Sequence, residues 1–106
     1  MRSKKHCFIS GPITNVPDYL NNFKVAEQQI INLGMIPVNP AACTQPLMDA
    51  GCLFDDPQWL AICFAILKQC DCVFHLKNWE FSKGAKREHK LAESLGMKIY
   101  YQDALY

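Results

Sequence analysis

The sequence predicts a doubly wound α/β fold of the flavodoxin-like or Rossmann-like kind, in which a parallel four-stranded sheet carries helices on both faces. Short apolar segments alternate along the chain with longer segments whose apolar residues recur every three or four positions. Strands that alternate with helices are joined by right-handed crossovers, which makes the sheet parallel. A chain of 106 residues is long enough for one core and too short for two, so residues 1–106 are expected to form a single domain.

The expected elements follow one another with turn residues between them. Strands are expected at residues 5–10, Met35–Val38, Asp71–Leu76 and Met97–Tyr101. Helices are expected at residues 18–33, from a cap at Asp55 or Asp56 to about Gln69, and at residues 84–95. Gly34 and Gly96 are typical residues to end the first and the last of these helices. Residues 41–56 show no clear period and predict an irregular connection that could act as a mobile flap.

The composition is that of an ordinary globular protein. Half of the residues are hydrophobic, a fifth are charged, and the formal net charge is +1. So small a net charge argues against bulk nucleic acid or an anionic membrane as the partner. No stretch is long and apolar enough to cross a bilayer, and the N-terminus lacks the apolar core of a signal peptide, so a cytoplasmic location is expected.

The six cysteines predict reduced thiols that pack in the core rather than a disulfide framework, because they stand in apolar runs of a chain without a signal peptide. Cys70 and Cys72 are too close in sequence for the usual zinc pair, and no second pair has suitable spacing. His75 and His89 have no partner at ligand spacing either. Neither a metal nor another cofactor is therefore expected. Asp71 precedes a strand and is interpreted as a strand-start cap, with a role as second carboxylate as the alternative.

Segment 78–88 is the most informative part of the chain, because it places a carboxylate on the apolar face of a predicted helix. Glu88 shares this face with small or apolar residues, namely Ala85, Leu91, Ala92 and Leu95. An inward-facing carboxylate costs free energy unless it is paired or used. Glu88 is therefore a candidate nucleophile for an electrophilic sugar carbon. The structural alternative is a carboxylate that caps loop amides or pairs with a buried arginine.

A doubly wound sheet binds ligands beyond the carboxyl ends of its strands, where the strand order reverses. Two segments, Ser10–Ile13 after the first strand and Lys77–Gly84 after the third, are expected to meet there. The candidate binding residues in them are Gly11, Pro12, Ile13, Trp79, Ser82 and Gly84. All of them except Ile13 also have a structural interpretation: Gly11-Pro12 as a turn, Trp79 as packing, Ser82 as a helix N-cap, and Gly84 as relief of crowding.

Several motifs together resemble the nucleoside 2-deoxyribosyltransferase superfamily, and most closely its small bacterial and phage branch. These motifs are Phe8-Ile9-Ser10-Gly11-Pro12-Ile13-Thr14, Val38-Asn39-Pro40, Cys70-Asp71 and Trp79-Glu80-x-Ser82-x-Gly84-Ala85-x-x-Glu88. The resemblance spans nearly the whole chain, and the last motif is its specific part.

The resemblance implies a role for each of these segments. Glu88 would be the nucleophile that forms a covalent deoxyribosyl-enzyme intermediate, which a second nucleobase or water then resolves. Ser82 and Gly84 would line the sugar or its 5′ end, and Gly11–Ile13 would border the base pocket. The ending Asp103–Tyr106 is similar to the transferases' ends, where a terminal tyrosine reaches an active site.

One position departs from the family's pattern. The family carries an acid that assists protonation of the base on its central helix, eight residues before the aspartate of the third strand, and that position is Cys63. A thiol cannot replace a carboxylic acid at neutral pH, although Asp49, Asp55 or Asp56 could substitute. A nucleoside or nucleotide N-glycosidase or deoxyribosyltransferase is thus the first hypothesis. The alternatives are a catalytically weakened nucleotide-binding module, such as a sensor, and an interaction protein that only uses the fold.

The central helix bears on assembly. Residues 58–68 are apolar on almost every side, so contact with one sheet face cannot bury them all. A second subunit is the simplest cover for the remainder. The related enzymes are homo-oligomers, which agrees with an expected dimer or higher homo-oligomer.

Overall fold

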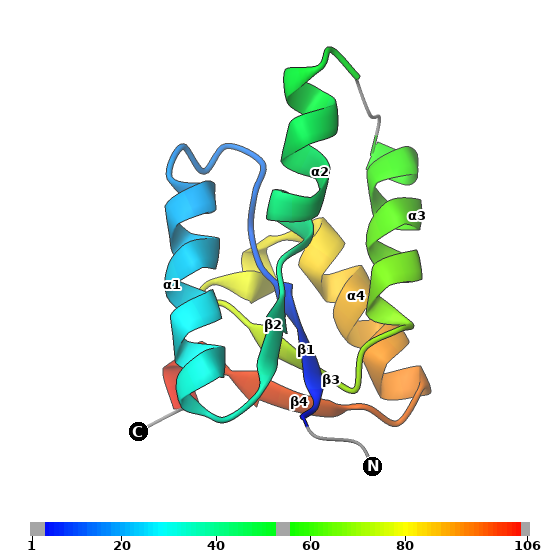
Figure 1. Cartoon of the computed structure of the whole chain (residues 1–106). Coiled ribbons are helices and arrows are strands. Elements are labelled where there is room, and N and C mark those ends of the chain that lie inside the picture. The colour runs from blue at the N-terminus through cyan, green and yellow to red at the C-terminus, as the bar shows by residue number, and fades with distance from the viewer. Residues whose placement is uncertain (1–3, 53–55, 105–106) are drawn as a thin grey trace.

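A computed structural model describes residues 4–52 and 56–104, and it has the predicted fold (Figure 1). Four parallel strands form one sheet in the order β2-β1-β3-β4. The strands are β1 (His6–Ser10), β2 (Ile36–Val38), β3 (Cys72–His75) and β4 (Lys98–Tyr101). The helices are α1 (Tyr19–Asn32), α2 (Pro40–Asp49), α3 (Asp56–Leu67) and α4 (Lys83–Ser94), with 3-10 turns η1 (Trp79–Phe81) and η2 (Gln102–Ala104). None of the helices within the described residues is long and apolar enough to span a membrane.

The two faces of the sheet bury separate apolar clusters because side chains alternate along each strand. Cys7 and Ile9 of β1 face α1, where they pack with Phe23 and Ile30. Phe8 points the other way, towards Leu67 of α3 and its neighbours on α4. Figure 1 shows this three-layer arrangement, with α1 on one side of the sheet and α3 and α4 on the other. Ser10 follows Phe8 at a spacing of two and therefore lies on the α3–α4 face.

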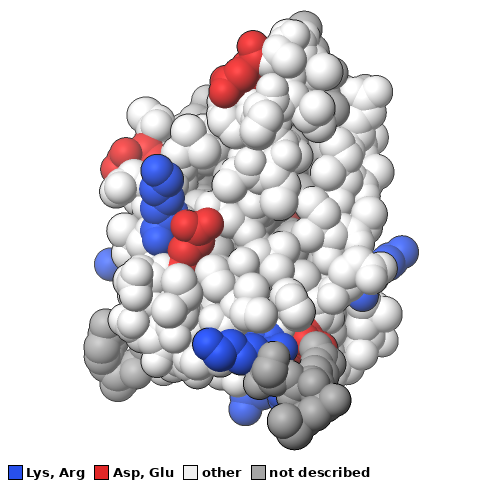
Figure 2. All heavy atoms as spheres, in the orientation of Figure 1, with Lys and Arg blue, Asp and Glu red and all other residues white. Residues whose placement is uncertain are grey.

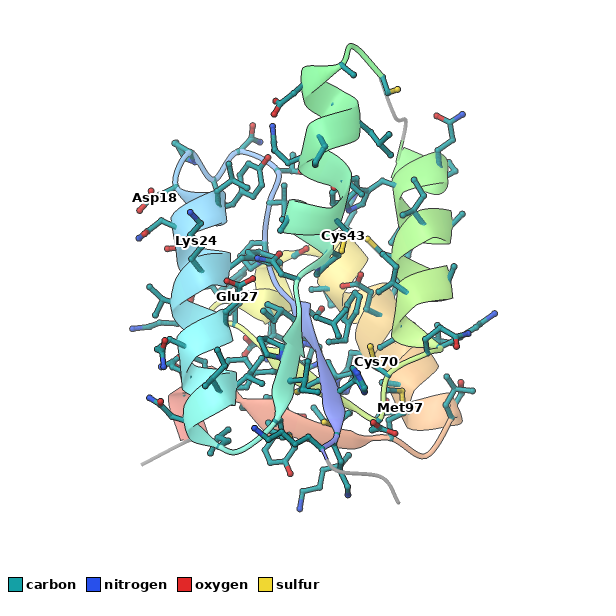
Figure 3. All side chains as sticks on the ribbon, in the orientation of Figure 1. Asp18, Lys24, Glu27, Cys43, Cys70 and Met97 are labelled. Carbon is teal, nitrogen blue, oxygen red and sulfur yellow. The ribbon has the colours of Figure 1, made fainter. Side chains whose placement is uncertain are left out.

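Helix α2 replaces most of the irregular connection predicted for residues 41–56, so that prediction was wrong. The Asn39 side chain accepts a hydrogen bond from the Ala42 amide at 3.2 Å, and Pro40 occupies the first helical turn, where its missing N–H is harmless. The Asn39 amide also donates to Glu27 of α1 at 3.1 Å, and Figure 3 shows Glu27 pointing from α1 towards this junction. This capping and tertiary contact sustain a helix that Pro46 would otherwise disfavour.

Helix α4 begins at Ser82, whose hydroxyl accepts a hydrogen bond from the Ala85 amide at 3.2 Å. Its inward face buries Ala85, Glu88 and Ala92, as the sequence pattern predicts. Leu95 is an exception, because it lies at the helix end and half of its surface is exposed. The apolar stripe is therefore shorter by one residue than predicted.

The cysteines divide into two groups. Cys7, Cys63 and Cys72 are buried, and all six thiols are free. Cys43 and Cys52 are exposed, which corrects the prediction that the cysteines serve the core. Figure 3 shows Cys43 on α2, and Cys70 and Met97 near the amino end of the sheet. Asp71 accepts a hydrogen bond from the His6 amide at 2.8 Å at that same edge, so it acts as the strand-start cap.

Candidate functional site

A cavity of about 670 Å³ opens at the carboxyl end of β1, between the α1 and α4 sides of the molecule. This volume lies within the range of small-molecule sites. The segment after β1 and the first turn of α4 form two of its walls, and α3 forms a third. Its lining includes the predicted site residues Gly11, Pro12, Ile13, Ser82, Gly84 and Glu88. The structure thus brings together six of the seven residues that the sequence singled out.

Glu88 lies at the buried end of this cavity and is only 6% exposed. Its position on the inward face of α4 points its carboxyl group at the end of β1. There the Ser10 hydroxyl donates a hydrogen bond of 2.7 Å to Glu88 Oε1. Ser10 is itself buried, so this bond is shielded from water and holds one carboxyl oxygen in a fixed direction. The sequence placed Ser10 in the segment but gave it no role.

Burial raises the pKa of the Glu88 carboxyl from its ordinary value of 4.5 to about 7. Hydrogen bonds from Ser10 and Cys63 act in the opposite direction, because they stabilise the charged form. Protonated and ionised Glu88 are therefore both well populated near neutral pH. A carboxyl group tuned in this way is typical of catalytic sites, where it can serve as nucleophile or as acid and base.

Cys63 is the α3 residue that lies next to Glu88 in the lining of the cavity. It is buried, lines the cavity and hydrogen-bonds to the Glu88 carboxyl group. Burial, together with the nearby carboxylate, raises the pKa of this thiol well above its ordinary value. The thiol therefore stays protonated at neutral pH and is a poor proton donor to a leaving base.

Asp49, one of the acids proposed as substitutes, does not take the place of this acid. Asp49 ends α2, is exposed, and accepts a hydrogen bond from Gln45 at 2.7 Å. It does not line the cavity. Asp55 lies outside the described residues, as do Tyr106 and the side chain of Asp56. Among the described cavity residues, Glu88 is the single carboxylate.

The two glycines of the site have different reasons to be there. A Cβ on Gly11 would lie 2.6–2.7 Å from side-chain atoms of Leu76, so no larger residue fits without moving the β3 end. A Cβ on Gly84 would meet Leu60 at 3.7 Å, an ordinary contact. Gly11 is therefore required for packing of the β1 loop, whereas Gly84 leaves room on the ligand side of α4.

Trp79 is the predicted site residue that the structure places elsewhere. Its ring stacks on His75 with centroids 4.2 Å apart and on His89 at 4.6 Å. The two histidines also share a hydrogen bond of 3.0 Å between His75 Nε2 and His89 Nδ1. Burial lowers the pKa of His75 to about 4, so the His75 imidazole is neutral at physiological pH. Trp79 packs behind the site and does not line the cavity.

Phe81 is the aromatic residue at the cavity that sequence reasoning missed. It is 86% exposed, although it belongs to a well-defined 3-10 turn next to Ser82. Trp59 of α3 adds a second, half-buried aromatic ring to the lining. The sequence Trp79-Glu80-Phe81 offers two aromatic rings for the site, and the geometry of the 3-10 turn decides that Phe81 is the one that lines the cavity.

Two cations and a helix end give one wall of the cavity a positive potential. Lys83 and Arg87 lie on the first turns of α4 and line the cavity. The free amides at the amino end of α4 add a partial positive charge there. This wall suits an anionic group such as a phosphate. Within residues 4–52 and 56–104, no cluster of three His, Cys, Asp or Glu side chains could hold a metal ion.

The fold and the site define a doubly wound α/β protein with a small-molecule cavity at the switch point of its sheet, where Glu88 is the one buried carboxylate among the described lining residues. The chain belongs to the DUF4406 family, a domain of unknown function whose family model matches residues 5–101. No curated protein matches the chain.

The burial of Glu88 predicts a specific pH dependence of stability. The folded state holds the Glu88 proton more tightly than the unfolded state, so its contribution to stability is present below pH 4.5 and is lost as pH rises to about 7. The total change is on the order of 3 kcal/mol. Compared with Glu88→Gln in urea unfolding, the wild-type protein should lose this stability between pH 4.5 and 7 and no more above pH 8. A constant difference between the two proteins would contradict the raised pKa.

Proposed function

We propose that this protein cleaves the N-glycosidic bond of a deoxynucleotide, or transfers its deoxyribosyl group, with Glu88 as the nucleophile. The observation that carries the proposal is the buried Glu88 carboxyl group, oriented by Ser10 and open to a cavity of nucleotide size. The resemblance of the Trp79–Glu88 motif to nucleoside 2-deoxyribosyltransferases supports the same chemistry. The DUF4406 family model leaves the activity open.

In the proposed first step, a Glu88 carboxylate oxygen forms a bond to C1′ of the sugar. The bond from C1′ to the base nitrogen breaks, and its electron pair leaves with the base, which takes up a proton from solvent water. In the second step, water or another base attacks C1′ and loses a proton. Glu88 is released as a carboxylate, and the products are the free base and a deoxyribose phosphate, or a new nucleotide.

The ionised form of Glu88 is the reactive one, and its environment explains how it forms inside the protein. The Ser10 hydroxyl stabilises the charge without neutralising it, because a hydroxyl has no net charge. Lys83 and Arg87 line the same cavity, so the negative charge of a substrate phosphate would lie close to their positive charges. We therefore favour a nucleotide over an uncharged nucleoside as the substrate.

A catalytically weakened nucleotide-binding module is the second candidate, and Cys63 favours it. The thiol occupies the place beside Glu88 where the related enzymes have an acid, and its raised pKa makes it a poor donor. Loss of a general acid lowers a rate by about 100- to 10,000-fold. Such a protein would bind the same nucleotides in the same cavity and release base very slowly.

Base release from a panel of deoxynucleoside 5′-monophosphates tests the first candidate. Glu88→Gln should lower the rate at least about 1,000-fold, because it removes the attacking oxygen. Ser10→Ala should lower it by roughly tenfold at pH 7 and shift the acidic limb of the pH profile upward, since the carboxylate loses a stabilising hydrogen bond. Liquid chromatography of the free base measures both.

Two substitutions on the exposed face of α4 serve as controls. Glu93→Gln and Ser94→Ala change the same residue types outside the cavity and should leave the rate unchanged. Base release that persists in Glu88→Gln would overturn the proposed nucleophile. Nucleotide binding without base release from the wild-type protein would favour the second candidate instead.

We also propose that the protein forms a homodimer through α3. Ala61 and Ala65 are exposed on this helix, and Ile62 and Phe64 are only partly buried. The helix carries no charged residue between Asp56 and Lys68. Figure 2 shows that the surface over α2 and α3 is almost free of charged side chains. Because α3 also supplies Trp59 and Leu60 to the cavity, a second subunit here would lie beside the site.

Light scattering at micromolar concentration tests the dimer. The wild-type protein should have twice the mass of the chain, and Ala61→Glu should be monomeric because it places a charge in the apolar contact. Asn21→Glu, on the exposed side of α1, is the matched control and should stay dimeric. A monomeric wild-type protein would contradict the proposal.

A further inference from the structure

A second cavity of about 660 Å³ lies at the same edge of the sheet, on the other side of the β1 loop. It is formed by α1, by the loop after β3 and by the start of η2. Three residues, Pro12, Thr14 and Phe81, line both cavities, so the two are neighbours across a shared lip. The first cavity alone is large enough for one nucleotide. The second one is therefore additional space that the proposed reaction does not need.

Phe81 stands on the shared lip with 86% of its surface exposed. A fully exposed phenylalanine forgoes the free energy of burial, which a bound planar group could restore. Nucleobases stack on aromatic rings of this kind in single-stranded nucleic acid sites. A base that entered the second cavity would pass directly over this ring.

The polar groups of the second cavity suit a base and a phosphate. Asn22 and Asn78 line it, and within the described residues neither side chain forms a hydrogen bond. Their amides can both donate to and accept from the edge of a base. Lys77 adds a cation that no described carboxylate neutralises. Gln102, in contrast, is fixed by bonds to the Lys77 amide and to Gln29.

We infer that the second cavity binds a second nucleoside, so that the ligand of this protein is a dinucleotide. The inference rests on the proposed function, because it takes the reacting nucleoside to be seated at Glu88. Doubly wound sheets bind their ligands in the crevice where the strand order reverses. Here that crevice lies between β1 and β3, and each cavity occupies one side of the loop that leaves β1.

The order of residues along η1 and α4 fixes how the two halves are linked. Phe81 precedes Ser82, and Ser82 precedes Lys83 and the free amides of α4. The positively charged wall of the first cavity, formed by Lys83, Arg87 and the amino end of α4, is thus adjacent to the shared lip. The second nucleoside is consequently attached through the 5′-phosphate of the reacting one, and Lys77 lies on its side of the lip.

Calorimetry on Glu88→Gln, which cannot turn over the ligand, tests the inference. The probes are the four deoxynucleoside 5′-monophosphates and the four homodinucleotides d(ApA), d(CpC), d(GpG) and d(TpT). A dinucleotide should bind about tenfold or more tightly than the monophosphate of the same base, because it adds one stacked base. Asn78→Gly and Lys77→Gln, added to Glu88→Gln, should each reduce this gain and leave monophosphate binding unchanged.

The choice of variants keeps the backbone intact. Asn78 has φ +68°, which glycine adopts freely, so Asn78→Gly removes the amide without strain. Lys86→Gln, on exposed α4 surface outside both cavities, is the matched control for Lys77→Gln. Equal affinities for dinucleotide and monophosphate, or a gain that survives both substitutions, would overturn the inference while the proposed function stands. Failure of every monophosphate to bind or to be cleaved would overturn both.

Discussion

The hydrogen bond from Ser10 to Glu88 is the interaction on which the site depends. It links the last residue of β1 to the middle of α4 and joins two segments 78 residues apart in the sequence. Without it, a carboxyl group that is 6% exposed would have a higher pKa and would lose the hydroxyl that holds its Oε1 atom. The fold thus tolerates an inward-facing acid because the end of a strand supplies a polar partner for it.

The residues behind this bond pack against the site from the side opposite the cavity. His75 pairs in register with Ser10 on the neighbouring strand, and its ring lies between that strand and Trp79. His89 completes the stack from α4, next to Glu88 in sequence but turned away from the cavity. An aromatic and imidazole layer therefore supports α4 from the side opposite the ligand. Gly11 lets the β1 loop pass close to Leu76 at the same level.

The sequence predicted the parts of the structure that depend on local pattern. The alternation of strands and helices predicted the parallel sheet, and helical spacing placed Glu88 on a buried face. Helix α2 was missed although its start carries a local signal, Asn39 as the N-cap with Pro40 in the first turn. Pro46 inside the helix argued against it, and the supporting contact between Asn39 and Glu27 cannot be read from periodicity. The sequence also did not show that Phe81, and not Trp79, lines the cavity, because the geometry of the 3-10 turn decides which of the two rings is exposed. The contact of Ser10 with Glu88 could have been predicted, because Ser10 follows Phe8 at a spacing of two and therefore faces α4.

Glu88 is an ionisable carboxyl group that is buried and bound by Ser10, and all of the proposed chemistry depends on this state. Carbon-13 NMR of the side-chain carboxyl groups, with Glu88→Gln to assign the signal, measures it directly. We expect a Glu88 pKa near 7 in the wild-type protein and a higher value in Ser10→Ala. A pKa near 4.5, or one that Ser10→Ala leaves unchanged, would contradict it.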